Sequence, residues 1–597
     1  MSNGHSRKLQ KISRRAYIAL NLAALSVRER LTLPAGRSSV DKSAANLDGA
    51  KRECLFPFMC RSTISNTADV IVVGSGSAGS TLAGRLAMES QRRVILLEAG
   101  GNDWNPAIRR PLLAGILSRW TSLTWPFMTE SMPDAAGRAL RYPQGRVIGG
   151  GSSINGMMYV RGSPVNFDEW AQMGLPAWSW KYVLPAYCRL EAYGGRPSEY
   201  RGRNGPLPVT RHPASNVLYR VFLEASQEAG YPLRIDLNSP PFEGVGRSDG
   251  TFKDGSRWSA ARAFLDPARD RANLRIVTDA QATRLIVSSG KVTGVQALVD
   301  GEATLFEADE VVVSAGTVNS PKLLLLSGIG PADHLRSMGI SVVADIAGVG
   351  MNLQDHVAVR ASYRCKQAVT LYPETRIDRA ALDFVRAWWF GSGPVSESPF
   401  GTMGLLRSLP DSPHVDLLAI FSPILSSATL RLPGVADGHD GDGYVCAAQV
   451  CQPESRGSVT LRSADPLAAP RIQPNFLSAP RDLAMLRGGL KIVRGILQQP
   501  AFNSYRGQVV DPDVPDNQLD EWIRHHAGPG LHDVGTCKMG AGADSMAVVN
   551  SQLQVRGISG LRVADASVMP RVTSGNTNAP SIMIGYRCAD FILNTAA

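Results

Sequence analysis

The stretch ADVIVVGSGSAGSTLAGRLAMESQRRVILLEAGG at residues 68–101 decides the fold of this chain. Residues 70–73 form a continuous β-branched apolar run, which is typical of a strand buried on both faces. The sequence GSGSAG follows at once and places Gly74, Gly76 and Gly79 in the G-x-G-x-x-G spacing. The first glycine permits a tight turn, the second lets the backbone approach a pyrophosphate, and the third lets a helix pack on the strand. The stretch therefore predicts a strand, a phosphate-binding turn and a helix.

The remainder of this stretch favours a dinucleotide as the ligand. Apolar residues recur at helical spacing over residues 77–88, so the N-terminus of the helix points at the phosphates. A second buried strand is predicted over residues 94–97, and Glu98 ends it 19 residues after Gly79. A carboxylate at this point accepts hydrogen bonds from ribose hydroxyls and disfavours a 2′-phosphate. The pattern predicts a Rossmann-like domain that binds NAD or FAD rather than NADP.

Composition and charge narrow the class of protein. The chain has 597 residues, of which 44% are hydrophobic and 19% charged, and this length suffices for two or more domains. No apolar run reaches the length of a bilayer span, so we expect no transmembrane segment, although peripheral membrane contact stays open. The net charge is +11, but residues 1–68 hold 12 Lys and Arg against 4 Asp and Glu. The body is thus close to neutral, and we expect no nucleic-acid partner.

The cysteines and the N-terminal tail bear on localisation. The eight cysteines are sparse and form no CxxC pair, which indicates reduced thiols and a cytoplasmic protein. In the tail, residues 1–67, the twin arginines of SRRAYIALNLAAL (13–25) suggest a Tat export signal to the periplasm, but charges at 28–30 stop the apolar run early. A mitochondrial transit peptide fits the composition loosely. We favour an over-extended reading frame with Met59 as the effective start and a tail without fixed structure.

Three further segments are rich in small residues. YPQGRVIGGGSSINGMMYVRG occupies residues 142–162, and its glycines let backbone amides approach a flat polar ligand. VVVSAGTVNSPKLLLLSGIGP at residues 311–331 predicts a strand, a turn and a helix. LRVADASVMPRVTSGNTNAPSIMIGYRCADFI at residues 561–592 ends a strand at Asp565 and begins a helix around the NTNAP turn. Their apolar residues are those of buried segments and not of a surface linker.

Together these segments resemble the glucose–methanol–choline (GMC) oxidoreductases, a family of FAD enzymes that act on alcohols. GRVIGGGSSINGMMYVRG and GTVNSPKLLLLSGIGP are similar to the two family signatures, and weaker matches lie at 168–187, 255–274, 349–356 and 453–466. The resemblance runs from Ala68 to the C-terminus. It implies an α/β fold, α+β overall, with a Rossmann-like FAD-binding domain and a discontinuous substrate-binding domain built on an antiparallel sheet. The implied segments are 68–160, 256–365 and 545–597 for the FAD-binding domain, and 161–255 and 366–544 for the substrate-binding domain.

The resemblance also implies which residues hold the cofactor. Members with covalently attached flavin carry a histidine in the glycine–serine loop, where this chain has Ile154, so we expect non-covalent FAD. Ala282 is expected to contact adenine through its backbone. By similarity, Gly74, Gly76, Gly79 and Glu98 hold the ADP half, Gly150, Ser152, Asn155, Gly156 and Met157 line the flavin ring, and Asp565 and Ala566 approach the pyrophosphate and ribityl chain.

The candidate base lies in LHDVGTCKMG, residues 531–540. In the family a histidine in an H-x-x-G-T-C context stands over the reactive edge of the flavin, and His532 matches it. The paired position, Asn or His, falls on Asn578. A neutral imidazole can accept the hydroxyl proton while hydride moves to flavin N5, and a neutral amide donor can stabilise charge on the oxygen. We expect oxidation of an alcohol to an aldehyde or ketone, with electrons passed to a quinone or, alternatively, to O₂.

Other interpretations of these residues are weaker. His525, His526, His532, Asp533 and Cys537 lack a regular ligand spacing, so we predict no metal. No G-x-S-x-G elbow suggests a serine hydrolase, and His356 is interpreted as structural. A non-redox use of the scaffold remains open, because the family includes a hydroxynitrile lyase and a light-driven fatty-acid decarboxylase. The decarboxylase uses a cysteine and an arginine, for which Cys451 and Arg471 are the candidates here. No carboxylate or aromatic box can be assigned to a quaternary ammonium, so the alcohol is not identified.

Overall fold

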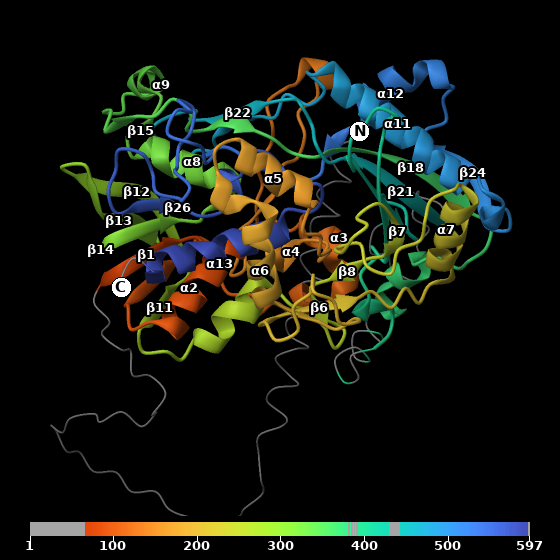
Figure 1. Ribbon diagram of the computed structural model, residues 1–597, viewed down its shortest axis with the longest axis horizontal. Coiled ribbons are helices and arrows are strands. Elements are labelled where there is room, and N and C mark those ends of the chain that lie inside the picture. Colours follow the sequence, from red (N-terminus) through yellow and green to blue (C-terminus); the bar gives the residue numbers. More distant parts are fainter. Residues whose placement is uncertain are drawn as a thin grey trace, which may run out of the picture. The chain divides into compact units, whose positions relative to one another are not determined.

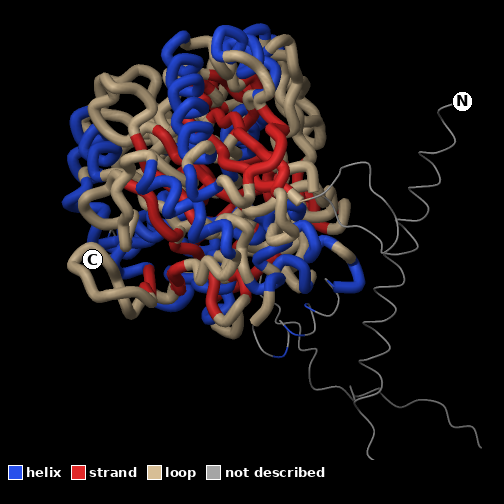
Figure 2. Tube along the Cα trace, turned by 90° about the vertical axis from the view of Figure 1, so that its right-hand side faces the viewer, coloured by secondary structure: helices blue, strands red, loops and turns tan. Residues whose placement is uncertain are grey.

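The computed structural model describes residues 66–379, 392–428 and 442–594, together with Asp383, Arg386 and Trp389. The predictions for the tail, including the export signal, the transit peptide and the start at Met59, fall outside the described residues. Within the described part, the strands lie in the interior and most helices lie around them (Figure 2). Two large sheets form the framework of the site.

The first sheet contains the dinucleotide-binding stretch. In spatial order its strands are β11 (Leu274–Val277), β2 (Val94–Leu97), β1 (Thr67–Val73), β14 (Glu302–Val313), β13 (Lys291–Val299) and β12 (Ala280–Ser288), and β26 (Leu561–Val563) also pairs with β14. β1 is parallel to both of its neighbours, whereas β12, β13 and β14 form an antiparallel meander. The strand, helix and strand expected over residues 68–101 are β1, α2 (Ser77–Glu89) and β2.

Helices place the ends of this sheet near the site. Helices α2 and α13 (Asn578–Asn594) lie side by side (Figure 1), and a Cβ at Gly585 would lie only 2.3 Å from the Ala78 carbonyl oxygen. Helix α8 (Gly316–Leu326) follows β14 and packs against β12. Both α2 and α8 begin at the carboxyl end of a central parallel strand. Their N-termini therefore converge at one edge of the sheet, where ligands bind in open α/β sheets.

The second sheet is antiparallel. In spatial order its strands are β24 (Arg506–Asp511), β18 (Val357–Cys365), β21 (Gly443–Val450), β20 (Leu417–Ser422), β19 (Thr402–Leu406) and β7 (Gly244–Arg247), and β25 (Gly528–Pro529) also pairs with β18. Residues up to 365 are expected in the first domain, but the structure places β18 in this second sheet. The physical reason is its pattern VAVRASYRC, whose alternating residues pack between two antiparallel neighbours.

The two faces of β18 differ. Val357, Val359, Ala361 and Tyr363 belong to a hydrophobic core covered by helix α11 (Pro480–Leu497), which packs against β18 and β21. Because side chains alternate along a strand, Arg360 points to the opposite face. The fold class expected from the sequence, a Rossmann-like sheet with a second antiparallel sheet built from interleaved segments, is confirmed.

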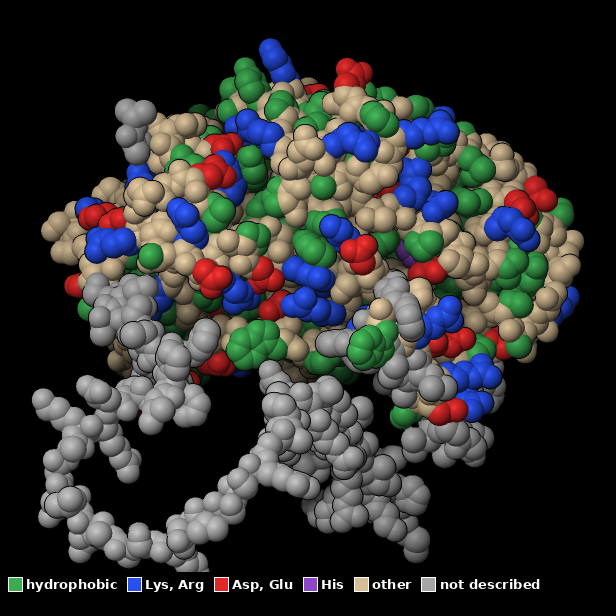
Figure 3. Space-filling view, turned by 90° about the horizontal axis from the view of Figure 1, so that it is seen from below, with side chains coloured by type: hydrophobic (Ala, Val, Ile, Leu, Met, Phe, Trp, Pro, Cys, Tyr) green, Lys and Arg blue, Asp and Glu red, His purple; other side chains and the backbone are tan. Residues whose placement is uncertain are grey.

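The surface shows no segregation of charge by sign in the view of Figure 3, where Lys and Arg side chains are interspersed with Asp and Glu. This agrees with a body whose net charge is small. None of the helices among the described residues is both long enough and apolar enough to span a membrane.

Candidate active site

A cavity of about 500 Å³ is lined by residues of both sheets. On the side of the first sheet it is bounded by the carboxyl ends of β1 and β2, the N-terminus of α2 and the first turn of α8. On the other side it reaches Arg360 of β18 and the segment that follows β25. The cavity is thus placed where the sequence predicts the cofactor and the base.

Two glycine turns form a cradle that suits a pyrophosphate. Gly74 has φ of +99°, and a Cβ there would lie 2.5 Å from the Ser314 carbonyl oxygen. Gly150 has φ of +51°, and its Cβ would lie 2.8 Å from the Gly76 Cα, so the two turns touch through their backbones. A Cβ at Gly76 would meet only one atom, at 4.0 Å, which leaves its cavity side open. No described side chain caps the N-terminus of α2, so its first amides can bind an anion.

Glu98 lies at the end of β2, as expected for a residue that holds a ribose. One oxygen, Oε2, accepts hydrogen bonds from the Ser75 amide (2.9 Å) and the Ser75 hydroxyl (2.6 Å), and Oε1 accepts from the Gly100 amide (2.8 Å). Burial raises the pKa of Glu98, and these hydrogen bonds act in the opposite direction. The carboxylate lines the cavity together with Ala282. The residues present therefore fit the adenosine half of a dinucleotide.

Most predicted site residues line the cavity. Gly79 and Ser152 do not, because Gly79 lets α2 pack on the glycine turn and the Ser152 hydroxyl donates to the Gly149 carbonyl (2.6 Å) inside its own loop. A Cβ at Gly79 would lie 1.9 Å from the Gly74 carbonyl oxygen. The predicted residues that line the cavity are Gly74, Gly76, Glu98, Gly150, Asn155, Gly156, Met157, Ala282, His532, Asp565, Ala566 and Asn578.

The loop that carries Asn155 to Met157 is held from behind. Arg257 is fully buried and donates through Nη1 to Asn155 Oδ1 (2.8 Å) and through Nε to the Ile108 carbonyl (2.8 Å). Burial lowers the pKa of Arg257 to about 9. Asn155 Oδ1 also accepts from the Met157 amide (2.9 Å), so this side chain fixes the loop as well as lining the cavity.

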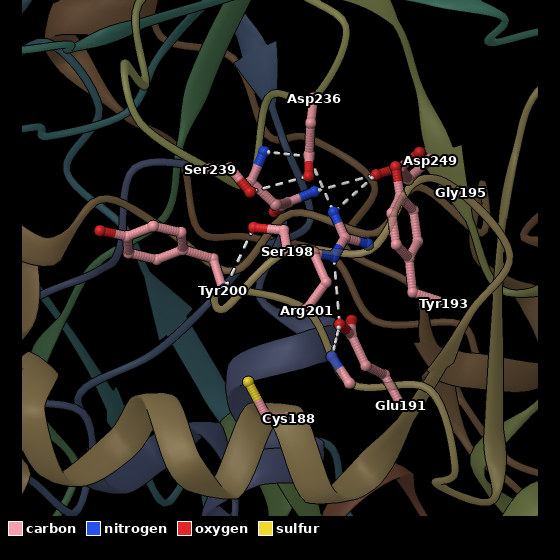
Figure 4. Close-up of polar contacts among 12 residues, drawn as sticks. Cys188, Glu191, Tyr193, Gly195, Ser198, Tyr200, Arg201, Asp236, Ser239 and Asp249 are labelled. Carbon is pink, nitrogen blue, oxygen red and sulfur yellow. Dashed lines mark hydrogen bonds and ion pairs between the residues drawn. The ribbon is translucent and has the colours of Figure 1, made fainter.

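A buried ionic network fixes the segment that follows this loop (Figure 4). Arg201 donates through Nη1 to Asp236 (2.8 Å) and Asp249 (3.0 Å), and through Nε to Glu191 (3.1 Å). The Tyr159 amide donates to the Asp249 carbonyl (2.8 Å) and so ties the segment to the network. Removing one member would leave a buried charge unpaired, which is strongly destabilising.

The candidate base, His532, lies just after β25 and within the cavity wall. Its amide donates to Asp355 Oδ1 (2.7 Å), and Tyr142 donates to the other oxygen of Asp355 (3.0 Å). Burial, followed by the charge of Asp533, raises the pKa of Asp355 well above its usual range. The backbone of His532 is thereby anchored, and its ring extends toward Asn576 and His356.

The hydrogen bonds around His532 assign its tautomer. His356 Nε2 lies 3.0 Å from the Thr573 carbonyl and must donate to it, so in the neutral ring Nδ1 is an acceptor. His532 Nδ1 lies 3.1 Å from His356 Nδ1 and therefore carries the proton that joins them. This leaves the lone pair of His532 on Nε2, which lies 2.8 Å from Asn576 Nδ2. The nitrogen free to accept a proton is thus the one beside Asn576.

Both histidines are neutral at physiological pH. Burial lowers the pKa of His356 to about 4. Burial, and secondarily the electrostatic effect of the neighbouring His356, lowers the pKa of His532 well below its ordinary value. The base is therefore expected to ionise at a lower pH than an ordinary histidine.

The sequence predicts Asn578 as the partner of His532. In the structure the asparagine that contacts His532 is Asn576. Asn578 is the first residue of α13, and its Oδ1 accepts from the Ser77 hydroxyl (2.7 Å). Asn576 precedes the helix, beside Gly575 with φ of +150°, and its Nδ2 faces His532. Its Oδ1 is buried and has no hydrogen-bond partner among the described residues. The helix start within NTNAP turns the second asparagine toward α2 and leaves the first to face the base.

Sequence reasoning missed three contributors to the setting of the base. His356 was expected to be structural, yet it contacts His532 directly. Gln449 Nε2 lies 3.1 Å from His356 Nδ1 and 3.4 Å from His532 Nδ1. Gly530 allows this approach, since a Cβ there would lie 2.9 Å from the His356 Cβ and 3.1 Å from Gln449 Oε1. The available signal in the sequence was the glycine- and proline-rich segment AGPGL, residues 527–531, which precedes the base.

The residues of the alternative interpretations do not assemble. No group of three His, Cys, Asp or Glu side chains that could hold a metal ion exists within the described ranges. Cys537 is fully buried, and burial raises the pKa of its thiol. Cys451 is likewise fully buried, Arg471 is exposed on β23 (Arg471–Gln473), and neither lines the cavity.

Comparison with known families and sequences gives consistent matches. The family model described as GMC oxidoreductase matches in two parts, an N-terminal part over residues 68–358 and a C-terminal part over residues 453–585. A Brucella canis protein named oxygen-dependent choline dehydrogenase is 40% identical over 530 residues, which cover 88% of this chain and 95% of the relative. A Sinorhizobium fredii protein of the same name is 41% identical over 530 residues, with the same coverage of both chains.

Solved structures also match over most of the chain. Pyridoxine 4-oxidase from Mesorbium loti superposes with a TM-score of 0.78 at 30% identity, covering 87% of this chain and 98% of that one. A variant of formate oxidase from Aspergillus oryzae, studied for FAD modification, gives a TM-score of 0.82 at 26% identity, covering 89% of this chain and 98% of that one.

Proposed function

Because the chain belongs to the GMC oxidoreductases, as an FAD-dependent oxidoreductase of CH–OH groups, we propose that it oxidises an alcohol with His532 as the base and Asn576 as the partner of the substrate oxygen. The observation that carries this assignment is the hydrogen-bond chain from Thr573 through His356 to His532. It keeps the proton on His532 Nδ1 and the lone pair on Nε2. A neutral imidazole in this tautomer is prepared to accept a proton.

The chain's own groups handle the hydroxyl proton and the charge on the oxygen. A hydroxyl within reach of both groups donates to His532 Nε2 and accepts from Asn576 Nδ2, which now lie 2.8 Å apart. As the proton moves to Nε2, the amide donor stabilises the negative charge that develops on the oxygen. Bound FAD supplies the hydride acceptor. Since burial disfavours the imidazolium, His532 holds the proton best while that charge remains beside it.

The charges of the cavity argue against choline as the substrate. The carboxylates that line it are Glu98, Asp533 and Asp565, and each already accepts hydrogen bonds from neighbouring groups. No other carboxylate among the described residues lines the cavity, whereas the cation Arg360 does. We therefore propose an uncharged or anionic alcohol, although relatives of this chain are named choline dehydrogenases.

The electron acceptor and the compartment are also proposals. Relatives named as oxygen-dependent and neighbours named as oxidases support O₂, and a quinone remains the alternative from the sequence. The cysteines Cys188, Cys365, Cys446, Cys451, Cys537 and Cys588 are free, which supports a reducing, cytoplasmic compartment.

Anaerobic reduction tests the function. Mixing the FAD-loaded enzyme with alcohols under nitrogen should bleach the yellow flavin, and His532→Ala should slow this step about 10²–10⁴-fold, the usual contribution of a general base. The variant should retain FAD, because the imidazole of His532 is not part of the glycine cradle. A lyase or decarboxylase would leave the flavin oxidised in the dark. If none of the alcohols bleaches the flavin, the proposal is contradicted.

A further inference from the structure

One ionised side chain in the cavity differs from all the others. The ionisable residues that line the cavity are Glu98, Lys322, Arg360, His532, Asp533 and Asp565. Lys322 donates to the Pro466 carbonyl (2.7 Å). The histidine and glutamate side chains, His532 and Glu98, and the two aspartates have the hydrogen bonds given above. No described residue makes a hydrogen bond or an ion pair with Arg360. Arg360 is therefore the one cation of the cavity without a partner among the described residues.

Arg360 lines the cavity from the second sheet. On the cavity face of the second sheet it lies opposite Ala447, and Ala358, two residues earlier, lies opposite Gln449. Gln449 contacts His532. Arg360 is thus one diagonal step from the residue beside the base, and such positions are roughly 7–8 Å apart. The cradle for the pyrophosphate belongs to the first sheet, at Gly76 and the N-terminus of α2.

The surroundings of Arg360 favour an anion. The side chain is well surrounded by protein, and this burial lowers the pKa of its guanidinium, yet the residue remains exposed because it extends into the open cavity. A guanidinium nevertheless stays ionised, and one that has lost part of its hydration is stabilised by an anionic partner. Neither Ala447 on the neighbouring strand nor any described carboxylate compensates it. A ligand with a negative group would.

Resting on the alcohol oxidation proposed above, we propose that Arg360 binds a carboxylate of the substrate, which is therefore a hydroxy acid with an apolar body between its alcohol carbon and its carboxylate. The planar guanidinium donates two parallel hydrogen bonds to a carboxylate. Apolar side chains also line the cavity, among them Phe400, whose ring lies 3.0 Å from the position of a Cβ on Gly156. An aromatic or short aliphatic body fits this arrangement.

The test compares one acid with its neutral ester. The FAD-loaded wild-type enzyme and Arg360→Met are reduced anaerobically with para-(hydroxymethyl)benzoate and with its methyl ester. In parallel, calorimetry measures the binding of para-toluate, which has the carboxylate but no hydroxyl to oxidise. Arg364→Met, on the same strand but outside the cavity, is the matched control. FAD content and melting temperature confirm that each variant folds.

The wild type should bind para-toluate and should reduce faster with the acid than with the ester at low concentration. Arg360→Met should weaken para-toluate binding and the acid's kcat/KM by roughly 10–100-fold, as the loss of charged hydrogen bonds does. The ester should change less than about threefold, and Arg364→Met should behave as wild type. The assignment of Arg360 is overturned if the wild type does not bind para-toluate, or if Arg360→Met lowers kcat/KM equally for the acid and the ester. Either result would leave alcohol oxidation intact. If neither these compounds nor any other alcohol reduces the flavin, the oxidation proposal fails, and para-toluate binding still tests Arg360.

Discussion

Replacing the two asparagines of NTNAP separately should distinguish a role in the reaction from a role in the fold. Asn576→Ala removes the amide donor that lies 2.8 Å from His532 Nε2. Loss of one such donor in a water-poor site costs about 3–4 kcal/mol of transition-state stabilisation, or roughly 10²–10³-fold in rate. Asn578→Ala instead removes the hydrogen bond from Ser77 (2.7 Å), which contributes about 0.5–1.5 kcal/mol to stability.

Stopped-flow reduction of the FAD-loaded variants at saturating alcohol measures the first effect, and thermal unfolding measures the second. We expect Asn576→Ala to be slow but as stable as wild type, and Asn578→Ala to be nearly as fast but less stable. Asn576→His keeps a donor at this position and should recover part of the rate. The reasoning is refuted if Asn578→Ala is the slower variant, because the residue facing the substrate oxygen would then be the second asparagine.

Three further outcomes follow from the structure. Acid precipitation should release the flavin into the supernatant, because the hydrocarbon side chain of Ile154 offers no atom for covalent attachment; flavin in the pellet would contradict this. Gly530→Ala would place a Cβ 2.9 Å from the His356 Cβ and should slow flavin reduction while leaving FAD content unchanged, as absorbance and kinetics can show. Because burial lowers the pKa of His532 well below its ordinary value, the rate of flavin reduction should be level through neutral pH and fall only in acid, whereas a midpoint between pH 6 and 7 would argue against a buried base.

The strand–helix–strand unit of the first sheet could be predicted from the sequence because its signals are local. A buried apolar run, a glycine turn and an acid at the next strand end fix β1, α2 and β2 within a few residues of each other. The second sheet could not be assembled in the same way. Its strands come from positions as distant as β7 (Gly244–Arg247) and β24 (Arg506–Asp511), and pairing over such separations leaves no periodic trace in the chain. For this reason the expected boundary at 365 misplaced β18.

The site shows the same division between local and distant information. The motif around His532 predicted its position, but its ring is set by His356, immediately before β18, and by Gln449 on the neighbouring strand β21. The choice between Asn576 and Asn578 depends on where α13 begins, and a helix boundary is uncertain by one or two residues from sequence alone. Asn576 and Asn578 are two positions apart, yet the first faces the base and the second faces α2.

The burial of His532 and the unpaired charge of Arg360 support each other physically. A base with a lowered pKa is neutral and ready, but it accepts a proton only if the charge left on the substrate oxygen is stabilised nearby, which Asn576 can do. A second negative charge beside the ring would favour the imidazolium before reaction and so remove the base. Arg360 keeps such a charge at the far end of an apolar body and neutralises it there. An anionic substrate can thus enter a cavity whose chemistry requires an uncharged histidine, and a quaternary ammonium would meet the guanidinium instead.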